Sequence, residues 1–64
     1  MTGKEIVKIL KKHGWVLDRI NGSHHIMRKE GLRPVPVPVH AGRDLPEGLV
    51  STLESQTGVT LLND

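Results

Sequence analysis

The chain has 64 residues, near the lower size limit for a domain held together by its hydrophobic core alone, so we expect one domain over residues 1–64. It has no cysteine, which excludes disulfides, thiolate zinc sites and thiol nucleophiles. Nine Lys and Arg against seven Asp and Glu give a net charge of +2, a mildly basic balance that permits a nucleic-acid partner without requiring one.

Residues 2–14 predict an amphipathic helix. Thr2 and Glu5 have the spacing of a capping box, in which each side chain bonds the backbone N–H of the other residue. Apolar residues recur at helical spacing and His13 completes their stripe, so we expect a half-buried His13. Gly14 is expected to end the helix by adopting the left-handed backbone conformation. The four lysines lie largely off this stripe, which favours a solvated face over a nucleic-acid patch.

Two strands are expected after this helix. Residues 15–20 have the aromatic and β-branched bias of a strand, and residues 24–29 can pair back on them. The Asn-Gly pair at 21–22 tolerates the positive φ of a hairpin turn. Residues 30–33 read as the next turn.

Proline and valine alternate for three repeats in residues 33–40. Because residues two apart in a strand aim their N–H groups at the same edge, the prolines remove every donor on one edge and the valines keep theirs on the other. Such a strand can pair on one side only, so we expect an edge strand that pairs with residues 24–29. The alternative is a polyproline II segment.

Residues 40–44 predict a loop, and residues 45–58 predict a second helix. Pro46 is expected in its first turn, Gly58 as its stop, and Leu49, Val50 and Leu53 as its apolar stripe. The tail after Gly58 is apolar, and the sequence leaves open whether it docks on this domain or on a partner. The expected fold is α+β, in the order helix, strand, strand, strand, helix, with both helices on one face of a three-stranded antiparallel sheet. Double-stranded RNA-binding domains share this architecture.

Four histidines suggest a metal site as a first hypothesis. His24 and His25 are neighbours in an expected strand, so their side chains point to opposite faces and cannot readily bind the same ion. The chain also lacks the ligand spacing of a known metal motif. We therefore expect no metal and no cofactor.

Acid–base catalysis by a histidine at the turn is the second hypothesis, because imidazole exchanges protons near neutral pH. Gly22 allows close backbone approach, and the Ser23 hydroxyl with nearby N–H groups can bond a phosphate oxygen. The cations that could surround a phosphodiester here are Arg19, Arg28, Lys29, Arg33 and Arg43. At this point ordinary surface histidines on a strand remain an open alternative.

A family resemblance bears on this choice. The run GWVLDRINGSHHIMRKEG at 14–31, followed by VPVH and DLPEGLVSTL, resembles the HicA-type toxins of bacterial toxin–antitoxin pairs, from about Lys4 to Gly58. The chain departs from the family pattern at Met27, where relatives often carry an aromatic residue, and in its long proline repeat and short tail.

The resemblance implies an mRNA interferase, a small metal-independent endoribonuclease that cuts messenger RNA and arrests growth until an antitoxin binds it. The family's catalytic histidine follows Gly-Ser, which maps to His24; His40 of VPVH matches a family position whose role we leave structural or auxiliary. On this interpretation the substrate-binding residues are Gly22, Ser23, His25, Arg28 and Lys29.

The implied partners are mRNA as substrate and a HicB-type antitoxin, with a toxin that is monomeric alone and forms a hetero-oligomer with the antitoxin. No apolar segment predicts a membrane span or a signal peptide, so we expect a cytoplasmic protein without a membrane partner. The rival functions are a non-catalytic RNA-binding module and a purely structural interaction domain.

Overall fold

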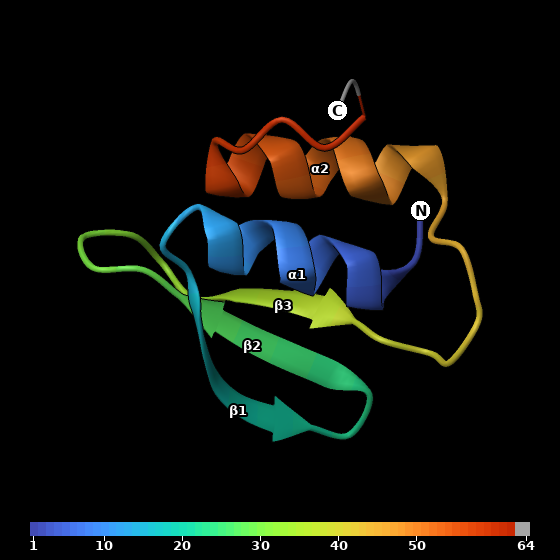
Figure 1. The fold of residues 1–64 in the computed structure, drawn as a ribbon, viewed down its shortest axis with the longest axis horizontal. Coiled ribbons are helices and arrows are strands. Elements are labelled where there is room, and N and C mark those ends of the chain that lie inside the picture. Colours follow the sequence, from blue (N-terminus) through green and yellow to red (C-terminus); the bar gives the residue numbers. More distant parts are fainter. Residues whose placement is uncertain (63–64) are drawn as a thin grey trace.

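The computed structural model describes residues 1–62 and has the expected order of elements (Figure 1). The elements are α1 (Gly3–Lys12), β1 (Val16–Asn21), β2 (His24–Arg28), β3 (Val35–Pro38) and α2 (Glu47–Thr57). The strands form one antiparallel sheet in the order β1-β2-β3. The predicted α+β fold is therefore confirmed. Neither helix is long and apolar enough to cross a membrane.

The start of α1 has the predicted capping box. The Thr2 N–H donates to the Glu5 carboxylate over 2.7 Å, and the Glu5 N–H donates to the Thr2 hydroxyl over 3.2 Å. At the other end Gly14 has a φ of 89°, and the N–H groups of Gly14 and Trp15 donate to carbonyls of the last helical turn. The expectation of a half-buried His13 is wrong. His13 is exposed, because the helix buries Val7 instead and ends before its stripe reaches position 13.

The hairpin turn is one residue later than the sequence suggested. Asn21 is the last residue of β1 and pairs with His24, so the turn consists of Gly22 and Ser23. Only Gly22 has a positive φ, 62°, which is the pattern of a type II′ turn with glycine at its first central position. Glycine therefore decides the turn, and Asn21 has ordinary strand geometry.

β3 is an edge strand, as the proline–valine alternation predicts. Val35 and Val37 lie opposite Met27 and His25 of β2, and the Val39 N–H extends the pairing by donating to the Ser23 carbonyl over 2.8 Å. Both strand valines are buried, while Pro36 is exposed. The alternation thus directs hydrogen bonding to β2 and directs the valine side chains to the core.

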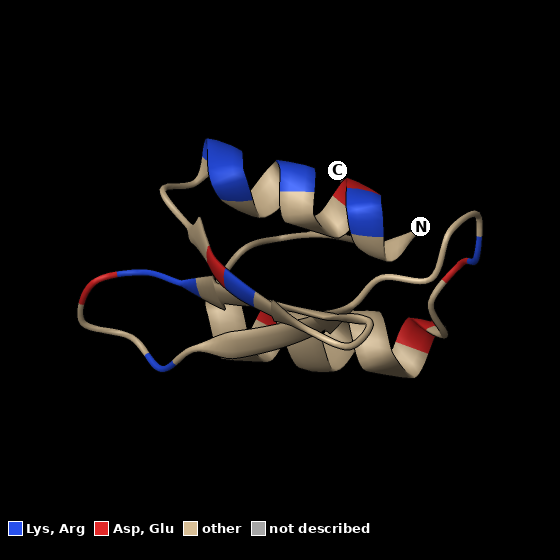
Figure 2. Ribbon diagram, turned by 90° about the horizontal axis from the view of Figure 1, so that it is seen from below, with Lys and Arg blue, Asp and Glu red and all other residues tan. Residues whose placement is uncertain are grey.

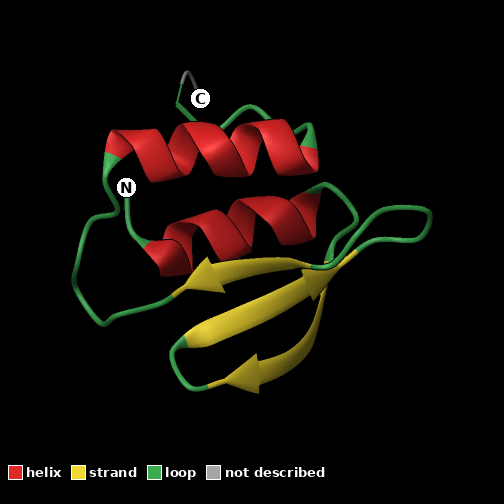
Figure 3. Ribbon diagram, turned by 180° about the vertical axis from the view of Figure 1, so that it is seen from behind, coloured by secondary structure: helices red, strands yellow, loops and turns green. Residues whose placement is uncertain are grey.

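One buried cluster joins both helices to one face of the sheet. α1 lies across this face, and α2 lies beside α1 and contacts β3 alone among the strands (Figures 1 and 3). The cluster contains Ile6, Val7, Leu10, Trp15, Met27, Val35, Val37, Val50, Leu53, Val59 and Leu61. The strand residues in it share the helix-covered face. We call the opposite side, which carries His24, Ile26 and Arg28 of β2, the open face.

The segment after α2 docks on the domain itself. Gly58 ends α2 with a φ of 72°, and the chain then runs back along the helix (Figure 3). Val59 and Leu61 are buried in the core. The Glu54 carboxylate accepts the N–H groups of Leu61 and Leu62 over 2.5 and 2.9 Å. The described part of the tail therefore completes this core; residues 63–64 of the predicted tail lie outside the described residues.

Two glycines of the helices should respond in opposite ways to alanine. A Cβ at Gly3 would overlap with the Pro38 carbonyl, where α1 touches the end of β3, whereas a Cβ at Gly48 of α2 would meet nothing within 4 Å. We expect Gly3→Ala to lower the free energy of unfolding by about 1 to 3 kcal/mol. We expect Gly48→Ala to raise it by about 0.5 to 1 kcal/mol, since alanine restricts the unfolded chain. Urea unfolding measures the free energy of unfolding of both variants. Equal changes in the two variants would contradict the close contact between Gly3 and the Pro38 carbonyl.

The tail contact should also make stability depend on pH. The N–H groups of Leu62 and Leu61 hold the pKa of Glu54 below its ordinary value of 4.5. A lowered pKa in the folded state means that the stabilisation is present above the ordinary value and is lost as the pH falls through the lowered one. Glu54→Gln should therefore flatten the acid limb of the stability profile, measured by urea unfolding from pH 7 to 3. Glu30→Gln, in an exposed loop, is the control and should leave the limb unchanged.

Candidate functional site

The β1–β2 turn lies at one end of the sheet and is flanked by exposed polar residues. His24, the first residue of β2, is exposed and lies opposite Asn21 on one side and Pro38 on the other. A Cβ at Gly22 would meet nothing within 4 Å, so the turn beside His24 is open to solvent. Ser23 is tied to β3 through its carbonyl, which leaves its hydroxyl available. The Gly-Ser-His segment is therefore a tight turn followed by an exposed imidazole.

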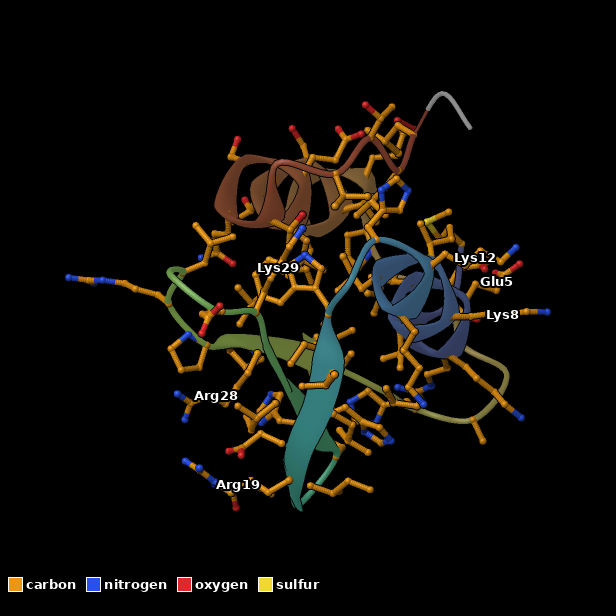
Figure 4. All side chains as sticks on the ribbon, turned by 60° about the vertical axis from the view of Figure 1, so that its left-hand side comes forward. Glu5, Lys8, Lys12, Arg19, Arg28 and Lys29 are labelled. Carbon is orange, nitrogen blue, oxygen red and sulfur yellow. The ribbon has the colours of Figure 1, made fainter. Side chains whose placement is uncertain are left out.

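The open face continues from His24 along β2. Strand alternation places Ile26 and Arg28 on the same face, and Arg28 lies about 13 Å from His24 along the strand. Arg19 of β1 pairs with Ile26, so it flanks the middle of this line. Figure 4 shows Arg19 and Arg28 pointing the same way, away from α1. An extended polyanion lying along β2 would meet an imidazole at one end and a guanidinium at the other.

The cations predicted for the site are not all free. The Arg19 guanidinium bonds the Asp18 carboxylate over 2.8 Å. The Lys29 ammonium donates to the His13 carbonyl over 2.8 Å and so caps the C-terminal end of α1. The Arg28 side chain is exposed and forms no hydrogen bond or ion pair with residues 1–62. Arg28 is therefore the best-placed cation of the open face.

His25 lies on the other side of the sheet from His24. Its Nδ1 atom is buried and has no hydrogen-bond partner among residues 1–62. It lines a concavity of about 600 Å³ together with Lys4 of α1 and His40 of the loop after β3. Sequence reasoning named His25 and His40 but missed Lys4, because only tertiary packing brings the first turn of α1 to the end of β2.

The structure assembles no set of metal ligands within residues 1–62. No three His, Asp or Glu side chains come together there. His24 and His25 face opposite sides of the sheet, and His13 lies at the end of α1, away from both. The chemistry available at the turn is thus proton transfer and anion binding.

Basic residues occur on the outer surface of α1, on the sheet and in the loops, and α2 has none (Figure 2). Lys8 and Lys12 point away from the side that carries Arg19 and Arg28 (Figure 4). Lys11 and Lys12 occupy the last turn of α1, where they complement the helix dipole. The open face therefore has its own cations, separate from the lysines of α1.

A protein-family model described as "HicA toxin of bacterial toxin-antitoxin" matches residues 3–59, nearly the whole chain. The chain belongs to the HicA toxin family. It is thus a component of a toxin–antitoxin system, and the family implies an antitoxin as its partner. A comparison with curated proteins finds no sequence match.

Met27, where the sequence suggests a departure from the family pattern, lies in the core. Its side chain is fully buried, at 0% exposed, between the helices and the sheet. The flexible thioether fills space in the core there. The Met27 side chain therefore contributes to packing, and no base could stack on it.

Substitutions of Lys29 and of its neighbour Arg28 together test whether the bond from Lys29 to the His13 carbonyl stabilises α1. Lys29→Met removes the ammonium that bonds the His13 carbonyl, so we expect it to lower the free energy of unfolding by about 0.3 to 1 kcal/mol. Arg28→Met removes an exposed cation without such a contact and should change stability by less than about 0.5 kcal/mol. Urea unfolding at low salt compares them; equal losses would show that the cap does not stabilise α1.

Proposed function

We propose that this HicA toxin is a metal-independent endoribonuclease that cuts mRNA and thereby stops translation and growth, with His24 as its catalytic general base or acid. The observation that carries the proposal is the position of His24, exposed on the open face beside the tight Gly22–Ser23 turn. A polymer as large as RNA can reach an imidazole at this position without any part of the protein moving.

RNA brings its own nucleophile, so the protein has little covalent chemistry to perform. His24 removes the proton of a 2′-OH, and that oxygen attacks the adjacent phosphorus. The bond from phosphorus to the 5′-oxygen breaks, which leaves a 2′,3′-cyclic phosphate on one fragment. The 5′-oxygen leaves with a proton and ends the other fragment as a hydroxyl.

Binding of the scissile phosphate is assigned to the turn. Gly22 has no side chain to hinder close approach, and the Ser23 hydroxyl can donate to a phosphate oxygen as charge develops there. Arg28 binds a phosphate further along β2. Lys29 can join it only by releasing the His13 carbonyl, so its contribution is smaller.

The leaving oxygen needs a proton donor. His25 and His40 share the concavity on the helix side of the sheet, whereas His24 faces the open side. Neither of them is therefore well placed to protonate the leaving group at His24, which favours water as the acid. With one catalytic histidine the enzyme is slow, and a toxin tolerates this because each cut disables a whole message.

The partner proposed for neutralisation is a HicB-type antitoxin. The family already implies an antitoxin, and covering the open face would block the access of RNA to His24. Such a partner would also cover Ile26 and Arg28, which present apolar and charged groups in one line.

Replacing His24 is the decisive test. His24→Ala should lower the rate of RNA cleavage at least about 100-fold, in the range of lost general acid–base catalysis, and should abolish growth arrest on expression. His13→Ala is the control, because the His13 side chain is exposed. The His13 carbonyl that accepts a hydrogen bond from Lys29 belongs to the backbone, so the substitution keeps that bond. Cleavage should persist in EDTA. The readout is gel analysis of a defined mRNA fragment incubated with purified protein.

Three results would contradict the proposal. Full cleavage by His24→Ala would remove the catalytic assignment, and loss of cleavage in EDTA would require a metal. Tight RNA binding by the wild-type chain without any cleavage would identify a non-catalytic RNA-binding module instead.

A further inference from the structure

The concavity that contains His25 brings together three nitrogen-bearing side chains from different parts of the chain. Lys4 comes from the first turn of α1, His25 from β2, and His40 from the loop after β3. Thr2, Val39, Ala41 and Gly42 complete its lining. None of these residues is acidic, so the concavity presents donors and positive charge with no carboxylate in its wall.

The acidic groups near this concavity are already engaged. Asp44 bonds the N-terminal amine of Met1 over 3.0 Å. Glu5 accepts the Thr2 N–H over 2.7 Å, and this hydrogen bond lowers the pKa of Glu5. Each carboxylate therefore has a bonding partner other than Lys4, and neither of them lines the concavity.

His25 carries the second observation. Its Nδ1 atom is buried without a hydrogen-bond partner among the described residues, so only the rest of the ring, which lines the concavity, can face a ligand there. A ring nitrogen that bears a proton can donate to an oxygen anion. A volume of about 600 Å³ accommodates a tetrahedral phosphate group and part of the sugar attached to it.

The concavity and the proposed catalytic residue lie at the same end of the sheet. His24 and His25 are consecutive, so their Cα atoms are about 3.8 Å apart while their side chains face opposite sides. Val39 bonds Ser23 at this end, which places His40 just beyond the turn. An RNA strand that passes around the end of the sheet would therefore meet His24 first and the concavity next.

We propose that Lys4, His25 and His40 form a second phosphate-binding site, which holds a backbone phosphate of the RNA strand adjacent to the phosphate at His24. The identity of the ligand as RNA rests on the proposed function, whereas the proposed binding of a phosphate group rests on the lining of the concavity alone. Inorganic phosphate has the same chemistry, and the two arms of the experiment separate the two sources.

The first arm titrates the full chain with inorganic phosphate and follows the imidazole signals of all four histidines by NMR. We expect saturable shifts at His25 and His40 that Lys4→Gln weakens, and no such shift at His13. Lys8→Gln is the matched control, one helical turn further along α1 and outside the concavity. Equal shifts at His13, or no shift at His25 and His40, would overturn the site whether or not the protein cuts RNA.

The second arm measures binding of a short single-stranded RNA by fluorescence anisotropy in the non-cleaving His24→Ala background. Adding Lys4→Gln should weaken binding about fivefold and lower the slope of log affinity against log salt by about 0.7, while adding Lys8→Gln should change neither. Phosphate binding without this loss of RNA affinity would overturn the assignment to RNA and leave a site for free phosphate. Unchanged cleavage by His24→Ala would end the catalytic proposal and leave the result for Lys4 intact.

Discussion

The alternation of proline and valine in β3 is the constraint on which the rest of the structure depends. The prolines cannot donate hydrogen bonds, so β3 pairs with β2 alone and lies at the edge of the sheet. The same alternation directs Val35 and Val37 into the core, where both helices cover them. One local pattern thus determines strand order and the buried face, and it also protects the edge of β3 from pairing with other chains.

Placing β3 at the edge makes β2 the central strand, and alternation along β2 puts the two adjacent histidines on opposite faces of the sheet. His25 shares the face of Met27 and lies under the start of α1, whereas His24 shares the face of Arg28 and remains exposed. The Gly22–Ser23 turn ends the sheet beside them. The two faces therefore provide different environments within one residue of each other: an open surface at His24, and a surface concavity that His25 lines together with Lys4 and His40.

Membership of the HicA family gives the fold a biological setting, a toxin with an antitoxin partner. The structure adds reasons why so small a chain suits that setting. Its core is completed by its own tail, through Leu61 and the Glu54 carboxylate, and His24, Ile26 and Arg28 of the open face are not part of that core. In the proposed mechanism RNA supplies the nucleophile, and the protein needs only one accessible imidazole, a tight turn and a few cations.

The sequence by itself determined the elements and their order, because the capping box at Thr2, the stop glycines and the prolines of β3 act through local geometry. It also separated His24 from His25, since strand alternation is local. It wrongly predicted a half-buried His13, because α1 ends at Lys12. It also placed the hairpin turn one residue too early, because β1 continues to Asn21. Only the tertiary structure decided that the tail docks on the core, that Lys29 caps α1, and that Lys4 meets His25 and His40. These contacts join residues distant in the chain, and their formation depends on how the helices pack on the sheet, which no local pattern specifies.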